Sequence, residues 1–232
     1  MTSTVTPTAG IQTTAESRTG RVLTRLGGIA LIASPLLTLG GNLTSPPQPD
    51  ESSAGYIASL AADPGISAVS AGLYHYGWIT LAFGVLAAIG LVRGPRGRAW
   101  TAAAAVIAAF GAMQFSGFLL ADHYVAALGV LPPDVGAGIF DAANGSIWTQ
   151  FWLSSAMVTA LLGVPLMLAG LARAGVIGWW AAPVYVAVWV VPAFLPAPWG
   201  ALVAGLASAP LVVVGLRLIQ RANLTVPQPV AG

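Results

Sequence analysis

The side chains in this sequence best suited to catalysis or metal binding are those of two histidines, His75 and His123. No other histidine occurs, and the sequence contains neither cysteine nor lysine. The lack of cysteine excludes disulfides and thiolate metal sites. Two imidazoles on neighbouring helices could ligate one haem iron, provided that they lie at the same height in the bundle.

The heights of the two histidines argue against that arrangement, unless the helix that carries His123 ends early and folds back. An α-helix rises about 1.5 Å per residue, so a height can be counted from the arginine that marks one end of a helix. His75 lies 18 residues from Arg93, or about 27 Å, and His123 lies 25 residues from Arg98, or about 37 Å. One iron cannot bridge a gap of about 10 Å. We therefore expect no metal and no cofactor, and we interpret His123 as part of the solvated end of a helix.

Four predicted helices place polar residues at the height of His75, and these residues are candidates for a ligand pocket. A histidine in a membrane segment usually faces the bundle interior and is a functional candidate. Ser, Asn and Gln also form interhelical hydrogen bonds without any ligand, and polar groups cost little near the edge of the apolar layer. Both interpretations stay open. The candidate pocket residues are His75, Gln114, Ser116, Asn42, Ser154 and Ser155.

The composition indicates that these residues lie in a membrane protein. Of the 232 residues, 56% are hydrophobic and 7% are charged, whereas a soluble domain carries about 25% charged residues. A fold of this size cannot bury so much apolar surface, so the bilayer must act as its solvent. The net charge of +2 gives no reason to expect a nucleic-acid partner.

The apolar segments predict an all-α, polytopic bundle of six transmembrane helices. Polar stretches rich in Pro and Asp separate the first helix from the second and the third from the fourth. In the first stretch, Tyr56, Ile57 and Leu60 share one helical face, which predicts a short interfacial helix. The predicted spans are residues 26–41, 66–92, 99–120, 148–171 and 176–191, and a sixth that follows residue 199 and ends near Leu218.

The charges predict the orientation of this bundle. With six spans, all nine arginines fall on one side, and every acidic residue except Glu16 falls on the other. Basic loops stay cytoplasmic, so we expect both termini inside a bacterial plasma membrane and the two longer loops outside. The predicted organisation is a disordered tail at 1–20, a transmembrane domain at 21–220 and a short tail at 221–232.

Three features of the sequence are similar to those of a known group of proteins. They are glycine pairs in the first span, an acidic, proline-rich first outer loop and the basic turn at residues 93–98. In these respects the chain resembles the small, uncharacterised multi-pass membrane proteins that are abundant in GC-rich actinobacteria. The resemblance implies a membrane location but no particular activity and no site residue.

Three classes of function are compatible with the sequence. The first is a non-enzymatic membrane component, which contacts the bilayer and binds a lipid, another apolar small molecule or a membrane protein partner. The second is a small transporter, because Pro-Leu-x-x-x-Gly recurs at 35–40, 165–170 and 210–215 and suggests a weak inverted repeat of three helices. The third is a membrane enzyme acting on a lipid or isoprenoid, with His75 as general base and Gln114 or Asn42 orienting the substrate. The sequence has no phosphate-binding loop and no Gly-x-Ser-x-Gly motif.

Overall fold

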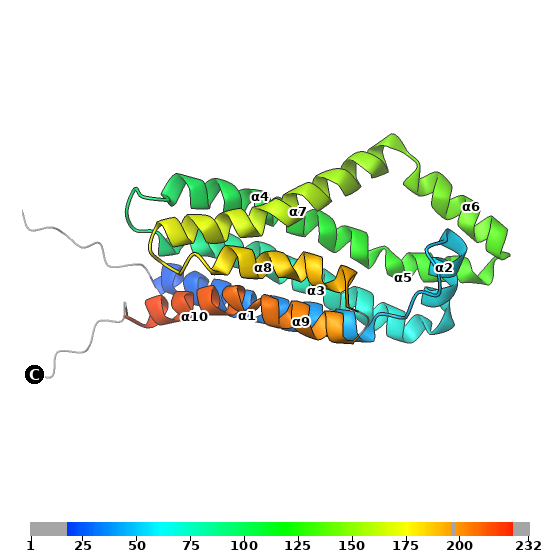
Figure 1. Ribbon diagram of the computed structural model, residues 1–232, viewed down its shortest axis with the longest axis horizontal. Coiled ribbons are helices and arrows are strands. Elements are labelled where there is room, and N and C mark those ends of the chain that lie inside the picture. The colour runs from blue at the N-terminus through cyan, green and yellow to red at the C-terminus, as the bar shows by residue number, and fades with distance from the viewer. Residues whose placement is uncertain (1–17, 196–197, 225–232) are drawn as a thin grey trace, which may run out of the picture.

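The computed structural model describes residues 18–195 and 198–224, and in these ranges every regular element is a helix. Residues 1–17 and 225–232, which hold most of the two predicted tails, lie outside the described residues. The helices run mostly along the long axis of the molecule (Figure 1). Their bounds are α1 Arg18–Thr44, α2 Ser53–Ala62, α3 Pro64–Ala88, η1 Ile89–Leu91, α4 Arg98–Leu120, α5 Asp122–Val125, η2 Ala126–Val130, α6 Pro133–Asn144, α7 Ile147–Arg173, α8 Ala181–Val190, η3 Val191–Ala193, α9 Trp199–Ala207 and α10 Ala209–Leu224.

Five helical segments of the described chain are long and apolar enough to cross a membrane. They match the first, second, third, fourth and sixth predicted helices, which confirms an all-helical architecture suited to a bilayer. The last of them bends at Ser208, between α9 and α10, two residues before Pro210, as expected for a proline-associated kink. The five segments are Arg18–Thr44, Pro64–Leu91, Arg98–Val130, Ile147–Arg173 and Trp199–Leu224.

The fifth predicted helix, residues 176–191, is shorter in the structure than the sequence pattern suggests. It begins only at Ala181, because Gly175 adopts a φ of 75° and the chain turns before the helix starts. The 10 residues of α8 and the 3 residues of η3 rise about 20 Å, less than a hydrocarbon layer of about 30 Å. The predicted count of six spans is therefore not established by helix length alone.

Small residues let the long helices approach one another closely. α1 packs on α3 and α10, α3 packs on α4, and α4 packs on α7. A Cβ added at Gly163 of α7 would lie 2.5 Å from the backbone nitrogen of Ala108 on α4, so only glycine fits there. Gly28 and Gly215 face each other in the same way, since a Cβ on either would lie 2.6 Å from the carbonyl oxygen of the other. Close packing of small residues is a main source of helix association in lipid.

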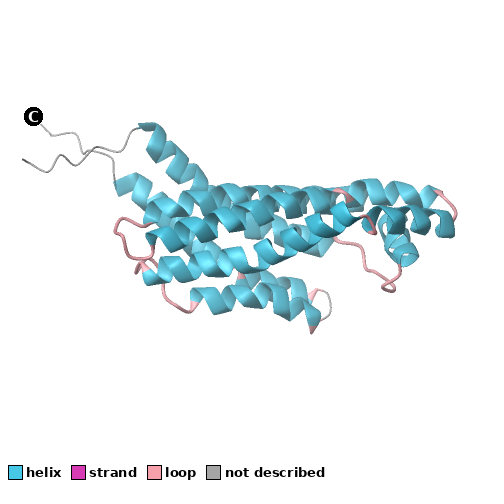
Figure 2. Ribbon diagram, turned by 90° about the horizontal axis from the view of Figure 1, so that it is seen from above, coloured by secondary structure: helices cyan, strands magenta, loops and turns pink. Residues whose placement is uncertain are grey.

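Short helices form a cap at one end of the bundle, at the opposite end from the start of α1 and the end of α10 (Figure 1). The predicted helix around Tyr56 is confirmed as α2, in which Ile57 and Leu60 are buried. The second long loop, for which no helix was predicted, forms α5, η2 and α6, and α6 begins at Pro133, a residue suited to the first position of a helix. Figure 2 shows the bundle from above, with its loops confined to the two ends and to this cap.

Candidate functional site

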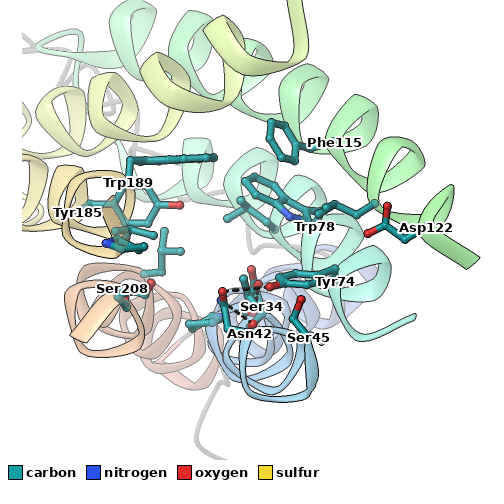
Figure 3. A pocket seen from close by; sticks show the side chains of 18 of the residues that line it. Ser34, Asn42, Ser45, Tyr74, Trp78, Phe115, Asp122, Tyr185, Trp189 and Ser208 are labelled. Carbon is teal, nitrogen blue, oxygen red and sulfur yellow. Dashed lines mark hydrogen bonds between the residues drawn. The ribbon is translucent and has the colours of Figure 1, made fainter. Parts of the chain in front are cut away.

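A cavity of about 380 Å³ lies beneath the cap, among α1, α3, α4, α8, α9 and α10. This volume is within the range of sites that bind drug-sized molecules. The cavity extends along α1 from Asn42 to Ser34, eight residues deeper, which corresponds to about 12 Å. Figure 3 shows the side chains of the surrounding helices converging on this space.

The end of the cavity nearest the cap is polar. The Tyr56 hydroxyl of α2 donates a hydrogen bond to Oδ1 of Asp122 on α5. The Tyr74 hydroxyl of α3 donates to Oδ1 of Asn42 on α1, over 3.0 Å. Burial, reinforced by the Asp122 carboxylate, raises the pKa of Tyr56. The Tyr56 phenol therefore stays protonated and remains a donor at physiological pH.

The deeper part of the cavity has an aromatic wall. The rings of Trp78 and Phe115 stack with their centroids 4.8 Å apart, and Trp189 lies 5.8 Å from Trp78 and 5.9 Å from Phe115. These three residues come from α3, α4 and α8, so the wall exists only once the three helices have packed. Tyr185 and Ser208 lie on the same side of the cavity as Trp189 (Figure 3).

Two donors in this wall have no hydrogen-bond partner among the described residues. They are the indole nitrogens Nε1 of Trp78 and Trp189, and both are buried. An indole N–H can only donate, so each requires an acceptor. Leaving such a donor unpaired costs about 1–3 kcal/mol. An occupant of the cavity with an acceptor atom would satisfy them.

The candidate residues from the sequence separate into four places. Nδ1 of His75 lies 2.7 Å from Oγ of Ser116 and 3.3 Å from its carbonyl oxygen, so Ser116 is the expected neighbour on α4. Gln114 instead accepts a hydrogen bond from Ser155 on α7, at 2.9 Å. Ser154 is exposed. Of the six candidates, Asn42 alone lines the cavity.

Helical phase explains this separation. Tyr74 and His75 are adjacent on α3, so their side chains point about 100° apart, a direction set by 3.6 residues per turn. Tyr74 faces the cavity, while His75 faces α4 and does not line it. The same rotation separates Phe115, in the cavity wall, from Ser116, which is buried against His75.

A periodic signal for the cavity was present in the sequence. Residues spaced by three and four positions share one helical face, and the cavity residues follow that spacing on three helices. Heights along the helices do not by themselves distinguish one helical face from another. The three sets are Ser34, Thr38 and Asn42 on α1, Tyr74, Trp78 and Leu81 on α3, and Phe115, Leu119 and Asp122 on α4 and α5.

No group of three or more His, Asp or Glu side chains that could hold a metal ion occurs in the described ranges. His123 is exposed and its ring contacts that of Tyr124, 5.5 Å away. Comparison with protein-family models, with curated proteins and with solved structures gives no match to this chain. The arrangement of side chains is therefore the basis for a functional proposal.

Proposed function

We propose that this protein is a non-enzymatic component of a bacterial plasma membrane that binds an amphiphilic small molecule in the cavity beneath its cap. In this proposal the chain crosses the membrane six times, with α8 and η3 as the fifth crossing, and both termini are cytoplasmic. The segregation of charge supports this orientation. The basic turn between α3 and α4 lies at the end of the bundle opposite the cap (Figure 1), and the cap contains Asp122, Asp134 and Asp141.

The observation that carries the binding proposal is the pair of unpaired indole donors. Trp78 and Trp189 both line the cavity, and neither Nε1 has a partner in the described chain. Buried polar groups are nearly always hydrogen-bonded, so two orphan donors on side chains that line one cavity favour an occupant with an acceptor atom. The polar end at Asn42 and the aromatic wall at Trp78 together suit a molecule with one polar end and one apolar end.

A second candidate function is transport of the same molecule. Transporter sites commonly lie beside a discontinuous helix, and the break at Ser208 borders the cavity. Of the prolines in the repeated motif, Pro35 lines the cavity, whereas Pro165 does not. Catalysis by His75 has less support, because His75 lies outside the cavity and its Nδ1 is bonded to Ser116.

Native mass spectrometry of the purified protein, with a variant that fills the cavity, tests the binding proposal. Ala204 of α9 lines the cavity, so Ala204→Phe should exclude the occupant. Val203 is its exposed neighbour on the same helix, so Val203→Phe is a matched control. We expect a bound small molecule in the wild type and in Val203→Phe, but not in Ala204→Phe. Equal occupancy in all three proteins, or a wild type without any bound molecule, would contradict the proposal.

A further inference from the structure

The cavity contains one charged side chain, and that charge is negative. Asp122 is the acid, and no arginine is among the residues that line the cavity. Oδ1 of Asp122 accepts the Tyr56 hydrogen bond, and Oδ2 has no partner in the described ranges. A half-buried carboxylate without a counter-charge is costly, since buried charges are normally paired. The cavity as it stands therefore lacks a cation.

Three hydroxyl groups and one amide N–H at the polar end donate hydrogen bonds within the protein. The Tyr56 hydroxyl donates to Asp122 and the Tyr74 hydroxyl donates to Asn42. The amide of Asn42 donates to the carbonyl oxygen of Thr38, at 3.0 Å, and the Thr38 hydroxyl donates to its own helix. The hydroxyl oxygens keep lone pairs for a ligand, beside the second N–H of Asn42 and the donors of Ser45 and Gln48. The polar end can therefore accept hydrogen bonds from a ligand, and the charge of Asp122 decides which ligand group it favours.

Aromatic rings surround the approach to Asp122. Asp122 and Tyr74 lie on one side of the cavity, and Trp78 lies between them and the deeper wall (Figure 3). Faces of tryptophan and tyrosine attract cations within about 6 Å of the ring centroid. A carboxylate next to such rings is a common arrangement for an organic cation, whereas an anionic phosphate would meet repulsion from Asp122 and no basic side chain.

From the charge and the rings together, we infer that the polar end of the bound amphiphile is an ammonium group that pairs with Asp122. This inference rests on the proposed binding function and specifies the ligand class. The ammonium group binds Oδ2 of Asp122, and the rest of the molecule lies along Trp78 and Trp189 and carries the acceptor atom that their indole N–H groups need. Two sources share this chemistry, a free lipophilic amine and the headgroup of an ethanolamine lipid.

Three probes with the same alkyl chain length distinguish binding through charge from binding through apolar contacts alone. Binding of tritiated dodecylammonium, dodecan-1-ol and dodecanoate is measured on the protein in nanodiscs of zwitterionic lipid, with empty nanodiscs to subtract partitioning. We expect wild type to bind the cation at least about tenfold more tightly than the alcohol, and the carboxylate most weakly, because a hydrogen bond to a charged group changes affinity by about ten- to a hundredfold. Asp122→Asn should reduce cation binding to the level of the alcohol.

Asp134→Asn is the matched control, because Asp134 is an exposed acid of the cap that does not line the cavity. It should leave all three affinities unchanged. Competition by lysophosphatidylethanolamine identifies the lipid source, and its failure to compete identifies a free amine.

The possible outcomes separate the inference from the function on which it rests. Equal binding of cation and alcohol by the wild type, or a cation preference that survives Asp122→Asn, overturns the ammonium assignment and leaves the binding function standing. Failure of all three probes to bind above empty nanodiscs overturns both. The wild-type ranking requires no variant, so the inference stays testable even if Asp122→Asn fails to fold.

Discussion

The hydroxyl of Tyr56 donates a hydrogen bond to the carboxylate of Asp122, although the two residues are 66 positions apart in the chain. Tyr56 belongs to the cap helix α2, and Asp122 belongs to α5, which continues α4. The bond therefore links the connection between α1 and α3 to the third long helix. It also lies at the polar end of the cavity, so one contact positions the cap and orients Asp122, the only acid among the described residues that line the site.

Loss of this bond should loosen the cap. Tyr56→Phe keeps the ring and removes the donor, and we expect a loss of about 1.5–3 kcal/mol in stability, the usual value for a hydrogen bond to a charged group. Relative to the wild type, amide hydrogen exchange should accelerate more in α2 than in the long helices, and the melting temperature of the protein should fall. Tyr124→Phe is the control, because Tyr124 is 70% exposed. Equal effects of the two variants would show that the bond contributes nothing to the cap.

Replacement by alanine should have opposite effects on stability at two glycines of the long helices. Gly163→Ala should lower the melting temperature, because its new Cβ would lie 2.5 Å from the backbone of Ala108, and such overpacking costs about 1–3 kcal/mol. Gly72→Ala has no atom within 4 Å of its new Cβ. It should stabilise α3 by about 0.5–1 kcal/mol, the usual gain of alanine over glycine in a helix. Thermal unfolding in detergent measures both, and a stable Gly163→Ala variant would refute the close α4–α7 contact.

The sequence predicted the helices better than it predicted the cavity, for a physical reason. Apolar length and hydrophobicity are local properties, so the segments that became α1, α3, α4 and α7 could be identified directly. The cavity depends on which face each helix turns inward, and a height scale contains no such information. His75 and Tyr74 differ by one residue in height, yet only Tyr74 reaches the cavity. Asp122 directly precedes His123, which was expected at a solvated helix end, and the local sequence gives no sign of its partner Tyr56, 66 positions away.

The orientation of the chain can be tested with single cysteines, since the sequence has none of its own. Gly94 and Gly138 are exposed, and a Cβ at either would meet nothing within 4 Å. In intact cells an impermeant thiol reagent should label Gly138→Cys in the cap and should not label Gly94→Cys in the basic turn. The reverse result would invert the proposed topology.

A third single-cysteine position tests the number of membrane crossings. Asn223 is exposed near the end of α10. If α8 and η3 form a true crossing, this end of α10 is cytoplasmic and Asn223→Cys is protected in intact cells. If α8 does not cross, only five segments span the membrane and the same cysteine is labelled from outside. Labelling of Asn223→Cys together with Gly138→Cys would therefore establish five crossings instead of six.

The last prediction separates the cavity from a pocket centred on His75. Tyr74→Phe removes a hydroxyl that lines the cavity and bonds to Asn42, so binding of the dodecyl probe with the highest wild-type affinity should weaken by about tenfold, or about 1.4 kcal/mol. His75→Leu removes the partner of the Ser116 hydroxyl, and Ser116 is only 1% exposed. An orphaned buried hydroxyl costs about 1–3 kcal/mol, so this variant should melt at a lower temperature while its affinity for the probe stays unchanged. The two variants should thus affect different measurements, one affinity and the other stability. Loss of binding in His75→Leu with full binding in Tyr74→Phe would instead place the ligand beside His75, as the equal heights of the polar residues first suggested.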